Sequence, residues 1–535
     1  MRSKLKTSAS SQSYVLAMWW MVVVPFMLLT VGFVLSSSTA FGQAAKPATR
    51  QPNIIFILND DLGWGDVGYH GAEIRTPTLD QLAKRGVELN RYYTFAVCSP
   101  TRAALMTGRS SLETGVDAPI SSQEALPMDA TLLPQHLKQL GYQTAMIGKW
   151  HLGESRAEYS PYKRGFDYYY GFLGGFIDHY THLTSSGRLD WQRNGVSVRE
   201  TGYTTDLMTE DAIKQIKSRN KNKPLFLYLA YDAPHAPVQA PEEDVKRYAQ
   251  ITNPVRRTFA AMVDHNDAQI ARVLATVESE GMANDTLIIW ASDNGPPLQG
   301  GATSGGLRGD KGSAFEGGQR VPAIAYWPGH LTGGKKLESV ITVLDWFPTL
   351  IKAAGGVVPS DKRIVGHDVM ATLGGAAQKP GVSMVLGNHV VNGDGYYESA
   401  YQWPWKLLRA PTSLIGAPLS PALGADGKTI MLFDVVADQN ETTDMAVKKP
   451  DLVRNLLSDL DAAPRAPRSL AEVGMAAGGM AAEPAAGMAA AAPAGMLASD
   501  VLAGSGALQG YTVEKGEPLA ESAARASAAK CLKSD

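Results

Sequence analysis

Three runs of consecutive apolar residues in this chain end abruptly at polar residues. A strand with one face in water would alternate apolar and polar positions, and these runs do not. Continuous apolar runs of this length are typical of parallel β-strands buried on both faces of a sheet. The three runs are NIIFIL at residues 53–58, LFLYLAY at residues 225–231 and TLIIWAS at residues 286–292.

Segments with helical periodicity alternate with these runs. In the first of them, Thr78 is the expected N-cap and Gly86 the expected end. Strands that alternate with helices predict an α/β domain over residues 51–380, in which helices cover both faces of a large, mostly parallel or mixed sheet. The predicted helices occupy residues 78–86, 131–142 and 256–281.

A second region begins near residue 381 and has shorter apolar runs at residues 384–391, 405–410 and 430–436. A helical pattern at residues 451–461 follows them, so residues 381–463 are predicted to form a smaller α+β subdomain. From residue 464 to residue 535 the composition changes to Ala, Gly, Met and Pro. Such a segment has little to bury and is predicted to be a flexible tail, with a membrane or partner helix as the alternative.

The N-terminal residues 1–42 have the pattern of an export signal. Arg2, Lys4 and Lys6 precede an apolar run at residues 14–35, and small residues follow it. Because the run is close to the ~20 residues that span a bilayer, an uncleaved anchor is the alternative. Either reading places the folded protein outside the cytoplasm, in the periplasm, outside the cell or on a membrane, and membrane contact is expected only if the segment is uncleaved.

Composition narrows the function classes. With 535 residues, of which 44% are hydrophobic, the chain can bury a large core. Lys and Arg total 50 against 52 for Asp and Glu, so bulk charge gives no attraction to nucleic acid, and any anion specificity must be local. The two cysteines, Cys98 and Cys531, lie far apart and make a poor disulfide framework.

Carboxylates follow two of the predicted buried strands. Asp60 and Asp61 come after the first run, and Asp293 and Asn294 come after the third. Ligands collect at the carboxyl ends of strands in open α/β sheets, and these oxygen ligands suit a hard divalent cation such as Ca²⁺ or Mg²⁺. The alternative for either pair alone is turn formation or helix capping.

Cationic side chains form a second group. Lys149 and His151 follow a short apolar run, His235 lies just beyond the second run, and Lys311 lies in a glycine-rich loop. Taken singly, each histidine is more often structural and each lysine more often solvated. Together with Arg102 and opposite a metal, they suit a tetrahedral anion that is stabilised by surrounding positive charge.

Five motifs bring these residues together: CSPTR at 98–102, NDDLGWGD at 59–66, GKWHLG at 148–153, APHAP at 233–237, and SDNG with LRGDKGSAFEGGQRVP at 292–295 and 307–322. Taken together, these motifs resemble those of the type I sulfatases of the alkaline-phosphatase superfamily. The resemblance covers residues 51–463 and implies an alkaline-phosphatase-like fold and a sulfuric ester hydrolase of the arylsulfatase type.

The resemblance also implies roles for individual residues. Cys98 is expected to be oxidised to Cα-formylglycine (3-oxoalanine) by a formylglycine-generating or sulfatase-maturing enzyme, and its hydrate is the expected nucleophile. Arg102 and Lys149 are expected to hold the hydrate, His151 to bond its second hydroxyl, and His235 and Lys311 to contact the sulfate and the leaving oxygen. Lys149 thereby also faces the substrate. The expected Ca²⁺ ligands, with Mg²⁺ as the alternative ion, are Asp60, Asp61, Asp293, Asn294 and an oxygen of the modified Cys98.

Among sulfatases, the segments at residues 165–182, 233–248 and 291–318 are most similar to the arylsulfatase B group, which removes 4-sulfate from N-acetylgalactosamine. Asp178 and His179 lie where that group has residues facing the substrate, so they are expected substrate contacts; the alternative is that they only order their loop. Animal members of the group carry disulfide cysteines that this chain lacks. A bacterial enzyme that removes sulfate from environmental polysaccharides fits this departure and the export signal.

Three functions remain open from the sequence. The first is a sulfatase that acts on a sulfated carbohydrate, with aryl sulfates as simple substrates. The second is a phosphate or phosphonate monoester hydrolase of the same superfamily, which can carry the same C-x-P-x-R motif. The third is an inactive relative that binds sulfated glycans, which the full set of expected site residues disfavours.

Overall fold

The computed structural model describes residues 51–378, 383–389, 396–411, 422–423 and 427–467. The predicted export segment at residues 1–42, Cys531 and the predicted tail from residue 468 onward lie outside the described residues. Within the described part of the chain, no helix is both long enough and apolar enough to cross a membrane.

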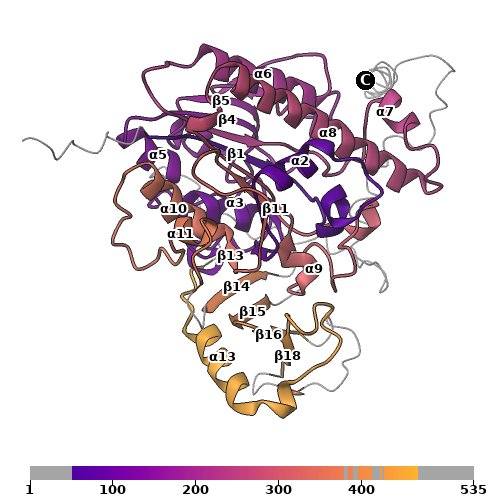
Figure 1. Ribbon diagram of the computed structural model, residues 1–535, viewed down its shortest axis with the longest axis vertical. Helices are drawn as coiled ribbons and strands as arrows, with labels where there is room; N and C mark the ends of the chain where they lie inside the picture. The colour runs from indigo at the N-terminus through magenta and orange to yellow at the C-terminus, as the bar shows by residue number, and fades with distance from the viewer. Residues whose placement is uncertain (1–50, 379–382, 390–395, 412–421, 424–426, 468–535) are drawn as a thin grey trace, which may run out of the picture. The chain divides into compact units, whose positions relative to one another are not determined.

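A ten-stranded mixed sheet forms the centre of the first domain (Figure 1). Its five middle strands are parallel, and the strands outside them add antiparallel pairs at both edges. The prediction of a large, mostly parallel sheet is therefore confirmed. From one edge to the other the strands are β12 (Lys335–Leu337), β2 (Val87–Leu89), β11 (Ala323–Tyr326), β9 (Thr286–Ser292), β1 (Asn53–Asn59), β8 (Leu225–Ala230), β4 (Gln143–Lys149), β5 (Tyr168–Phe172), β6 (Gln192–Arg193) and β7 (Val196–Ser197).

Helices cover both faces of this sheet because its middle strands carry apolar side chains on both faces. Side chains of β1 alternate between two separate cores: Ile54 and Phe56 belong to one, and Ile55 and Ile57 to the other. The first core is closed by α3 (Cys98–Thr107), α5 (Leu133–Gln139) and α10 (Trp346–Ala353), and the second by α2 (Pro77–Arg85), α6 (Thr204–Ser218) and α8 (Pro254–Ser279) (Figure 1).

Shorter elements complete the first domain. A three-stranded sheet consists of β10 (Arg320–Val321), β3 (Tyr92–Tyr93) and β13 (Ile341–Thr342), and the short helices are α4 (Ser111–Thr114), α7 (Glu242–Lys246), α9 (Glu316–Gln319) and α11 (Met370–Leu373).

The helices predicted at residues 131–142 and 256–281 are confirmed as α5 and α8, but the expected N-cap of α2 is wrong. The helix begins at Pro77, so Thr76 is its N-cap residue and Thr78 lies inside its first turn. Proline favours the first helical position because its missing N–H would have no partner there. The carboxylate of Asp267 in α8 accepts the N–H groups of Thr78 and Leu79, both at 2.9 Å. A distant side chain therefore caps this helix.

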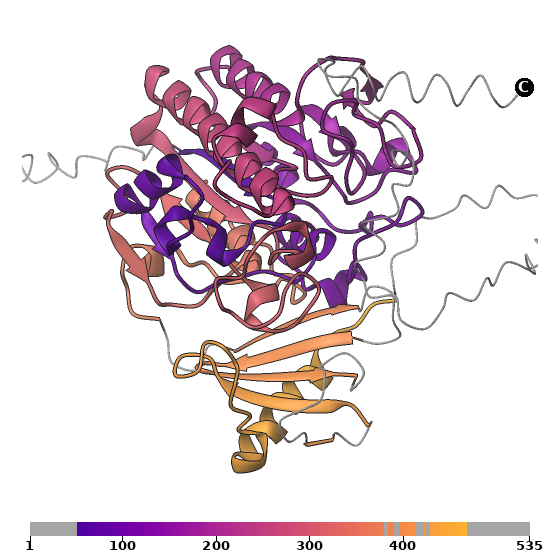
Figure 2. The same ribbon diagram turned by 90° about the vertical axis from the view of Figure 1, so that its right-hand side faces the viewer.

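A second, antiparallel sheet forms the C-terminal region (Figure 2). Helix α13 (Pro450–Ala462) packs on one face of it through Leu456 and Leu460, while Phe433 on the other face packs with Phe315 of the first domain. The predicted small sheet with a terminal helix is confirmed. Its strands, in order, are β14 (Ser383–His389), β15 (Tyr396–Gln402), β16 (Trp405–Ala410), β18 (Thr429–Asp434) and β17 (Ala422–Leu423).

The register of the middle strands brings their carboxyl ends to one edge. Asn59, the last residue of β1, pairs with Ser292, the last residue of β9. On the other side of β1, Ala230 ends β8 and pairs with Gly148 of β4. Gly148 has a φ of +105°, and a Cβ atom added there would lie 1.9 Å from the carbonyl oxygen of Ala230, so only glycine fits before Lys149.

Candidate active site

Four polar side chains from two strand ends form the base of the site. Asp60 and Asp61 follow β1, Asp293 and Asn294 follow β9, and all four residues are at most 1% exposed. Asn294 Nδ2 donates to Asp61 Oδ1 at 2.7 Å, and the backbone N–H of Asp61 donates to Asp293 Oδ1 at 3.2 Å. The structure thus brings together the four residues that the sequence predicted as metal ligands.

Positive side chains converge on these carboxylates. Lys149 Nζ donates to Asp60 Oδ2, and Arg102 Nη2 lies 2.9 Å from Asp293 Oδ2 and 3.4 Å from Asp60 Oδ2. Lys311 Nζ lies 2.7 Å from Asp61 Oδ1. Burial alone would raise the pKa of Asp60, but the charges of Lys149, His235 and Arg102 outweigh it and hold this pKa well below its usual range. Asp60 is therefore ionised at neutral pH.

Two buried oxygens of this group have no hydrogen-bond partner. They are Asp60 Oδ1 and Asn294 Oδ1. A buried polar atom without a partner is costly, and an oxygen that accepts from no donor is well suited to bind a cation. Ligand atoms of Asp60, Asp61 and His235 also lie within 4.8 Å of one another. These donors fit a hard divalent cation.

Cys98 lies at the first position of α3, next to the carboxylates. Its Sγ atom is 3.2 Å from Nδ1 of His151. The other ring nitrogen of His151 lies 3.2 Å from the carbonyl oxygen of Ile120. A carbonyl only accepts, so Nε2 carries the proton and Nδ1 is free to accept from Cys98. Burial, reinforced by the charges of Lys149 and Arg102, lowers the pKa of His151 well below its usual value and keeps the ring neutral.

Arg102 lies one helical turn after Cys98 and links the strand ends. Its Nη1 donates to the carbonyl oxygen of Lys149 at 2.9 Å, while its other nitrogens bind Asp293. Arg102 and Lys149 are both fully buried. The C-x-P-x-R spacing therefore places the cysteine and the arginine on the same side of α3, facing the ends of β4 and β9.

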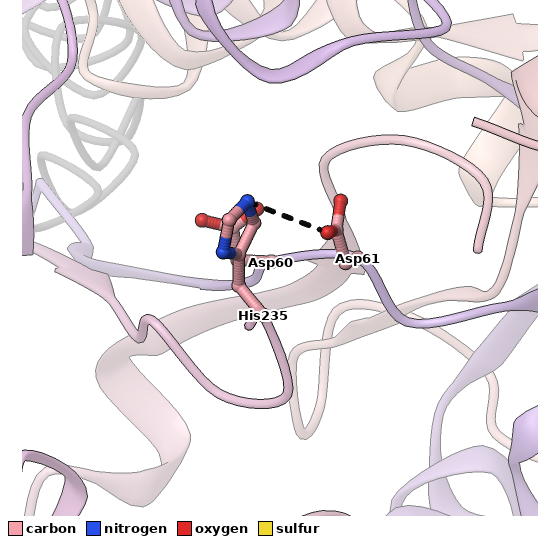
Figure 3. A group of neighbouring side chains, drawn as sticks. All are labelled: Asp60, Asp61 and His235. Atoms are coloured by element: carbon pink, nitrogen blue, oxygen red, sulfur yellow. Dashed lines mark ion pairs between the residues drawn. The ribbon is translucent and has the colours of Figure 1, made fainter. Parts of the chain in front are cut away.

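His235 approaches Asp61 from the loop after β8 (Figure 3). Its Nε2 lies 3.5 Å from Asp61 Oδ2, and its Nδ1 donates to the carbonyl oxygen of Ala236 at 2.7 Å. Burial, followed by the charge of Lys311, lowers the pKa of His235 to about 4. The unprotonated Nε2 therefore faces a carboxylate oxygen, an arrangement that a cation or a proton-bearing ligand between them would stabilise.

A cavity of about 1250 Å³ opens above these groups. Cys98, His151, His235, Lys311 and Asp61 all line it. The predicted nucleophile, both predicted histidines and Lys311 are therefore accessible from one cavity, whereas Asp60, Arg102 and Lys149 do not line it.

Comparison with known proteins identifies this arrangement. The Sulfatase family model matches residues 52–357. Arylsulfatase J from Mus musculus is 35% identical over 463 residues, covering 78% of this chain and 76% of that protein. This chain belongs to the sulfatase family. N-acetylgalactosamine-6-sulfatase from Mus musculus is 33% identical over 397 residues, covering 69% of this chain and 75% of that protein. The crystal structure of Ps i-CgsB in complex with k-i-k-neocarrahexaose has a TM-score of 0.72 at 30% identity, covering 79% of this chain and 96% of that one.

Two of the sulfatase residues predicted to contact substrate have other contacts. His179 is 1% exposed; its Nδ1 lies 3.2 Å from Asp232 Oδ2, and its Nε2 donates to the carbonyl oxygen of His235 at 3.2 Å. Asp178 accepts from the N–H of Thr181 and from Gln239 Nε2, at 2.8 and 2.7 Å. Neither residue lines the cavity. These contacts support the alternative reading, in which both side chains order the loop around His235.

The sulfatase also uses a buried charge cluster that the sequence did not reveal. Lys406 of β16 lies 3.2 Å from Glu316 Oε1 and 2.8 Å from Glu441 Oε1, and all three residues are fully buried. Arg308, in the loop that carries Lys311, donates to the carbonyl oxygen of Glu441 at 2.8 Å. The C-terminal sheet therefore supports the Lys311 loop. Such a cluster has no local sequence signal, because its members come from three separate segments.

Proposed function

We propose that this sulfatase removes sulfate from a sulfated carbohydrate by means of Cα-formylglycine formed at Cys98, with a Ca²⁺ ion held beside it. The position of Cys98 carries the proposal: it lines the cavity, its Sγ contacts His151, and it lies next to the strand ends where Asp60 Oδ1 and Asn294 Oδ1 have no partners. The hydrated formylglycine would supply a geminal diol: one hydroxyl would attack sulfur as the bond from sulfur to the alcohol oxygen breaks, and loss of the other hydroxyl's proton would re-form the aldehyde as its carbon–oxygen bond to sulfate breaks.

His151 is placed to handle the proton of that second hydroxyl. Its ring is neutral, its Nδ1 is free to accept, and its Nε2 is fixed by the carbonyl oxygen of Ile120. A neutral imidazole within hydrogen-bond distance of the reacting group is the usual form of a general base. Arg102 and Lys149 orient Asp60 and Asp293 from below and keep both carboxylates at the strand ends.

Asp60, Asp61 and Asn294 would hold Ca²⁺ through their buried oxygens, with Asp293 and an oxygen of the modified Cys98 completing the set. The ion supplies positive charge that offsets the charge on the sulfate oxygens. Mg²⁺ is the alternative ion for the same oxygen donors.

Lys311 and His235 lie on the cavity side of Asp61, where the ester oxygen of a bound substrate would leave. Both line the cavity, and both contact Asp61. A leaving alkoxide needs a proton. Lys311 lies in a position to donate one or to stabilise the developing charge, and His235 would do so once Nε2 has gained a proton.

The relatives' names support a carbohydrate substrate. One relative is an N-acetylgalactosamine-6-sulfatase, and a solved relative is in complex with k-i-k-neocarrahexaose. We propose a sulfated sugar of this kind as the substrate, with the 4-sulfate of N-acetylgalactosamine, suggested by the arylsulfatase B resemblance, as one member of the test set. The pattern of residues 1–42 further supports a proposal that the enzyme acts after export.

A desulfation screen tests this function. The purified chain, with Cys98 in its mature form and Ca²⁺ present, is incubated with N-acetylgalactosamine 4-sulfate, the 6-sulfate, carrageenan oligosaccharides, an aryl sulfate and an aryl phosphate. Release of sulfate from at least one carbohydrate, with the aryl sulfate preferred over the aryl phosphate, is expected. A strong preference for the phosphate would establish the phosphomonoesterase alternative, and glycan binding without turnover would establish the inactive one.

A further inference from the structure

The connection between β5 and β6 forms one wall of the active-site cavity and has no role in the chemistry described above. It contributes an aromatic residue, Phe176, and a polar segment, residues 184–188. The first lies beside His235, and the second ends in Arg188, which also lines the cavity. This wall therefore presents an apolar surface and a positive charge to whatever enters.

Phe176 is unusually exposed for a large aromatic side chain in a folded core region. Its exposed fraction is 44%, and its ring stacks on His235 with centroids 5.8 Å apart and an angle of 22° between the planes. One face of the ring is therefore covered by a residue of the catalytic group. Exposed apolar surface in a concave site usually marks a place where ligand binds, and the C–H face of a pyranose ring is a fitting partner for an aromatic face.

Residues 184–188 form the tip of a short hairpin. Leu183 and Leu189 pair at its base, the N–H of Thr184 donates to the carbonyl oxygen of Arg188 at 2.8 Å, and Gly187 has a φ of +80°. Asp190 ties this base to the segment before Phe176 by accepting from the N–H of Gly174 at 2.8 Å. The apolar and the cationic parts of the wall are thus held in a fixed relation.

Arg188 is available to a ligand. Its side chain is 54% exposed, and Nη2 donates to Glu154 Oε2 at 2.7 Å. A guanidinium has five N–H donors in a planar fork, so this contact leaves donors for a second oxyanion. Arg188 is the exposed member of this pair, since the Glu154 side chain is only 14% exposed, so a sulfate or carboxylate can share the guanidinium with Glu154.

We propose that the β5–β6 connection contacts two sugar units of the substrate. Phe176 stacks on the unit that carries the scissile sulfate, and Arg188 binds a sulfate or carboxylate on the neighbouring unit. The cavity volume of about 1250 Å³ exceeds the ~300–1,000 Å³ of an ordinary small-molecule site and leaves room for more than one sugar. This inference rests on the proposed function and adds that the substrate is an oligosaccharide with more than one negative charge.

Three disaccharides test the subsite. They share the scissile sulfate and differ only in the neighbouring unit, which is neutral, carboxylated or sulfated. The wild type should prefer one of the two anionic disaccharides. For that disaccharide, Arg188→Gln should raise KM about tenfold more than it does for the neutral disaccharide, because a charge-assisted hydrogen bond is lost. Preference for the sulfated over the carboxylated substrate identifies the anion. Arg156→Gln, an exposed arginine that does not line the cavity, is the matched control and should change none of the three values.

Phe176 is tested in the same assay. Phe176→Ala should raise KM for all three disaccharides about tenfold because the stacking surface is lost. Phe176→Trp should restore KM because it supplies another aromatic face, which separates loss of stacking from displacement of His235. Tyr162→Ala, which removes a ring of similar exposure outside the cavity, is the control.

The role of Arg188 would be overturned if Arg188→Gln changed KM equally for the neutral and anionic substrates, or changed it for none of them.

Binding separates this inference from the proposed function. Calorimetric titration of the Cys98→Ala protein with the three disaccharides needs no turnover. Tighter binding of the anionic disaccharides that disappears in the Cys98→Ala/Arg188→Gln protein supports the subsite even if the wild type hydrolyses no sulfate ester. Equal affinity for all three disaccharides contradicts the subsite even if the enzyme proves to be an active sulfatase.

Discussion

The Sγ atom of Cys98 lies 3.2 Å from Nδ1 of His151, and both residues are buried, at 2% and 7% exposure. A thiol in this position has its hydrogen-bond acceptor already in place, with the cavity on one side and the carboxylates of the strand ends on the other. The same geometry serves an oxidised form of the side chain, because any hydroxyl that replaces Sγ meets the same imidazole nitrogen.

The state of Cys98 is the first prediction. Mass spectrometry of the peptide that contains Cys98, taken from active protein, should show the mass of the aldehyde or its hydrate. Cys98→Ala should lower kcat by about 10³-fold or more, because the nucleophile is lost. Fully active protein with an unmodified thiol at this position would contradict the mechanism. Circular dichroism of the Cys98→Ala protein serves as the control for folding.

Removal of divalent cations should lower both activity and stability. Asp60 Oδ1 and Asn294 Oδ1 are buried without donors, so the Ca²⁺ proposed for this site should bind the folded state in preference to the unfolded one. At a hundredfold excess of Ca²⁺ over its Kd, the folded state gains about 2.7 kcal/mol. Differential scanning fluorimetry should detect this gain as a rise in Tm when Ca²⁺ is added back to chelator-treated protein. Asp60→Asn should reduce this rise. An unchanged Tm across added Ca²⁺ and Mg²⁺ would show that the cluster holds neither ion.

The proton donor to the leaving group can be assigned from leaving-group dependence. If Lys311 donates the proton, Lys311→Ala should slow aryl sulfates with poor leaving groups by about 10²–10⁴-fold and spare those with good ones, whereas His235→Ala should slow both kinds equally. The measurement is the slope of log kcat/KM against the pKa of the leaving phenol. The reverse pattern assigns the role to His235, and two unchanged slopes would exclude both residues as acids.

A histidine far from the site should make stability depend on pH. His265 Nε2 lies 2.9 Å from Asp206 Oδ1, and its Nδ1 lies 2.5 Å from Asp244 Oδ2, joining α6, α7 and α8. Burial would lower the pKa of His265, but these two carboxylates outweigh it and raise the pKa above 6.5. The protonated ring is therefore favoured in the folded state, and its stabilisation is fully present below pH 6.5 and lost as pH rises through the raised value.

Urea unfolding of the wild type and of His265→Gln tests this dependence. The wild type should be more stable by about 1–3 kcal/mol near pH 5.5, since charged hydrogen bonds are lost in the variant, and the difference should shrink near pH 9. A difference that does not change with pH would show that His265 is neutral in the folded protein.

The buried Lys406 should be essential for stability. Lys406→Met removes the cation that lies between Glu316 and Glu441, and breaking a buried ion cluster in this way costs about 3–5 kcal/mol. Urea unfolding should show this loss. Lys246→Met, at an exposed lysine of α7, is the control and should leave the midpoint unchanged. A midpoint for Lys406→Met equal to that of the wild type would show that the cluster does not hold the two sheets together.

The chemistry at the strand ends could be predicted because its signals are local. An apolar run that stops at polar residues specifies both a buried strand and the side chains at its carboxyl end, and Asp60 and Asp293 lie where this pattern predicts. Parallel strands in register bring their carboxyl ends together whatever the intervening sequence, so the two pairs of residues meet although they are far apart in the chain. The C-x-P-x-R spacing is likewise contained within one helix.

The features that the sequence did not reveal depend on contacts between distant segments. Strand β15, with the sequence YYESAYQ, gives no apolar run, yet Glu398 is buried there because Arg409 of the neighbouring strand pairs with it at 2.8 Å. The cap of α2 comes from Asp267, far along the chain. His179 could be placed near the substrate by resemblance alone, whereas its contacts with Asp232 and with the backbone of His235 support the alternative in which it orders a loop.

The burial of Cys98 and the support of the Lys311 loop by Glu441 also set an order of events during synthesis. Cys98 emerges from the ribosome long before Glu441, and the loop that carries Lys311 gains its last support only when that later segment arrives. Once α3 packs against the ends of β4 and β9, Cys98 is 2% exposed and is reached through the cavity alone. The maturing enzyme expected for Cys98 would therefore have its widest access between the emergence of residue 98 and the packing of α3.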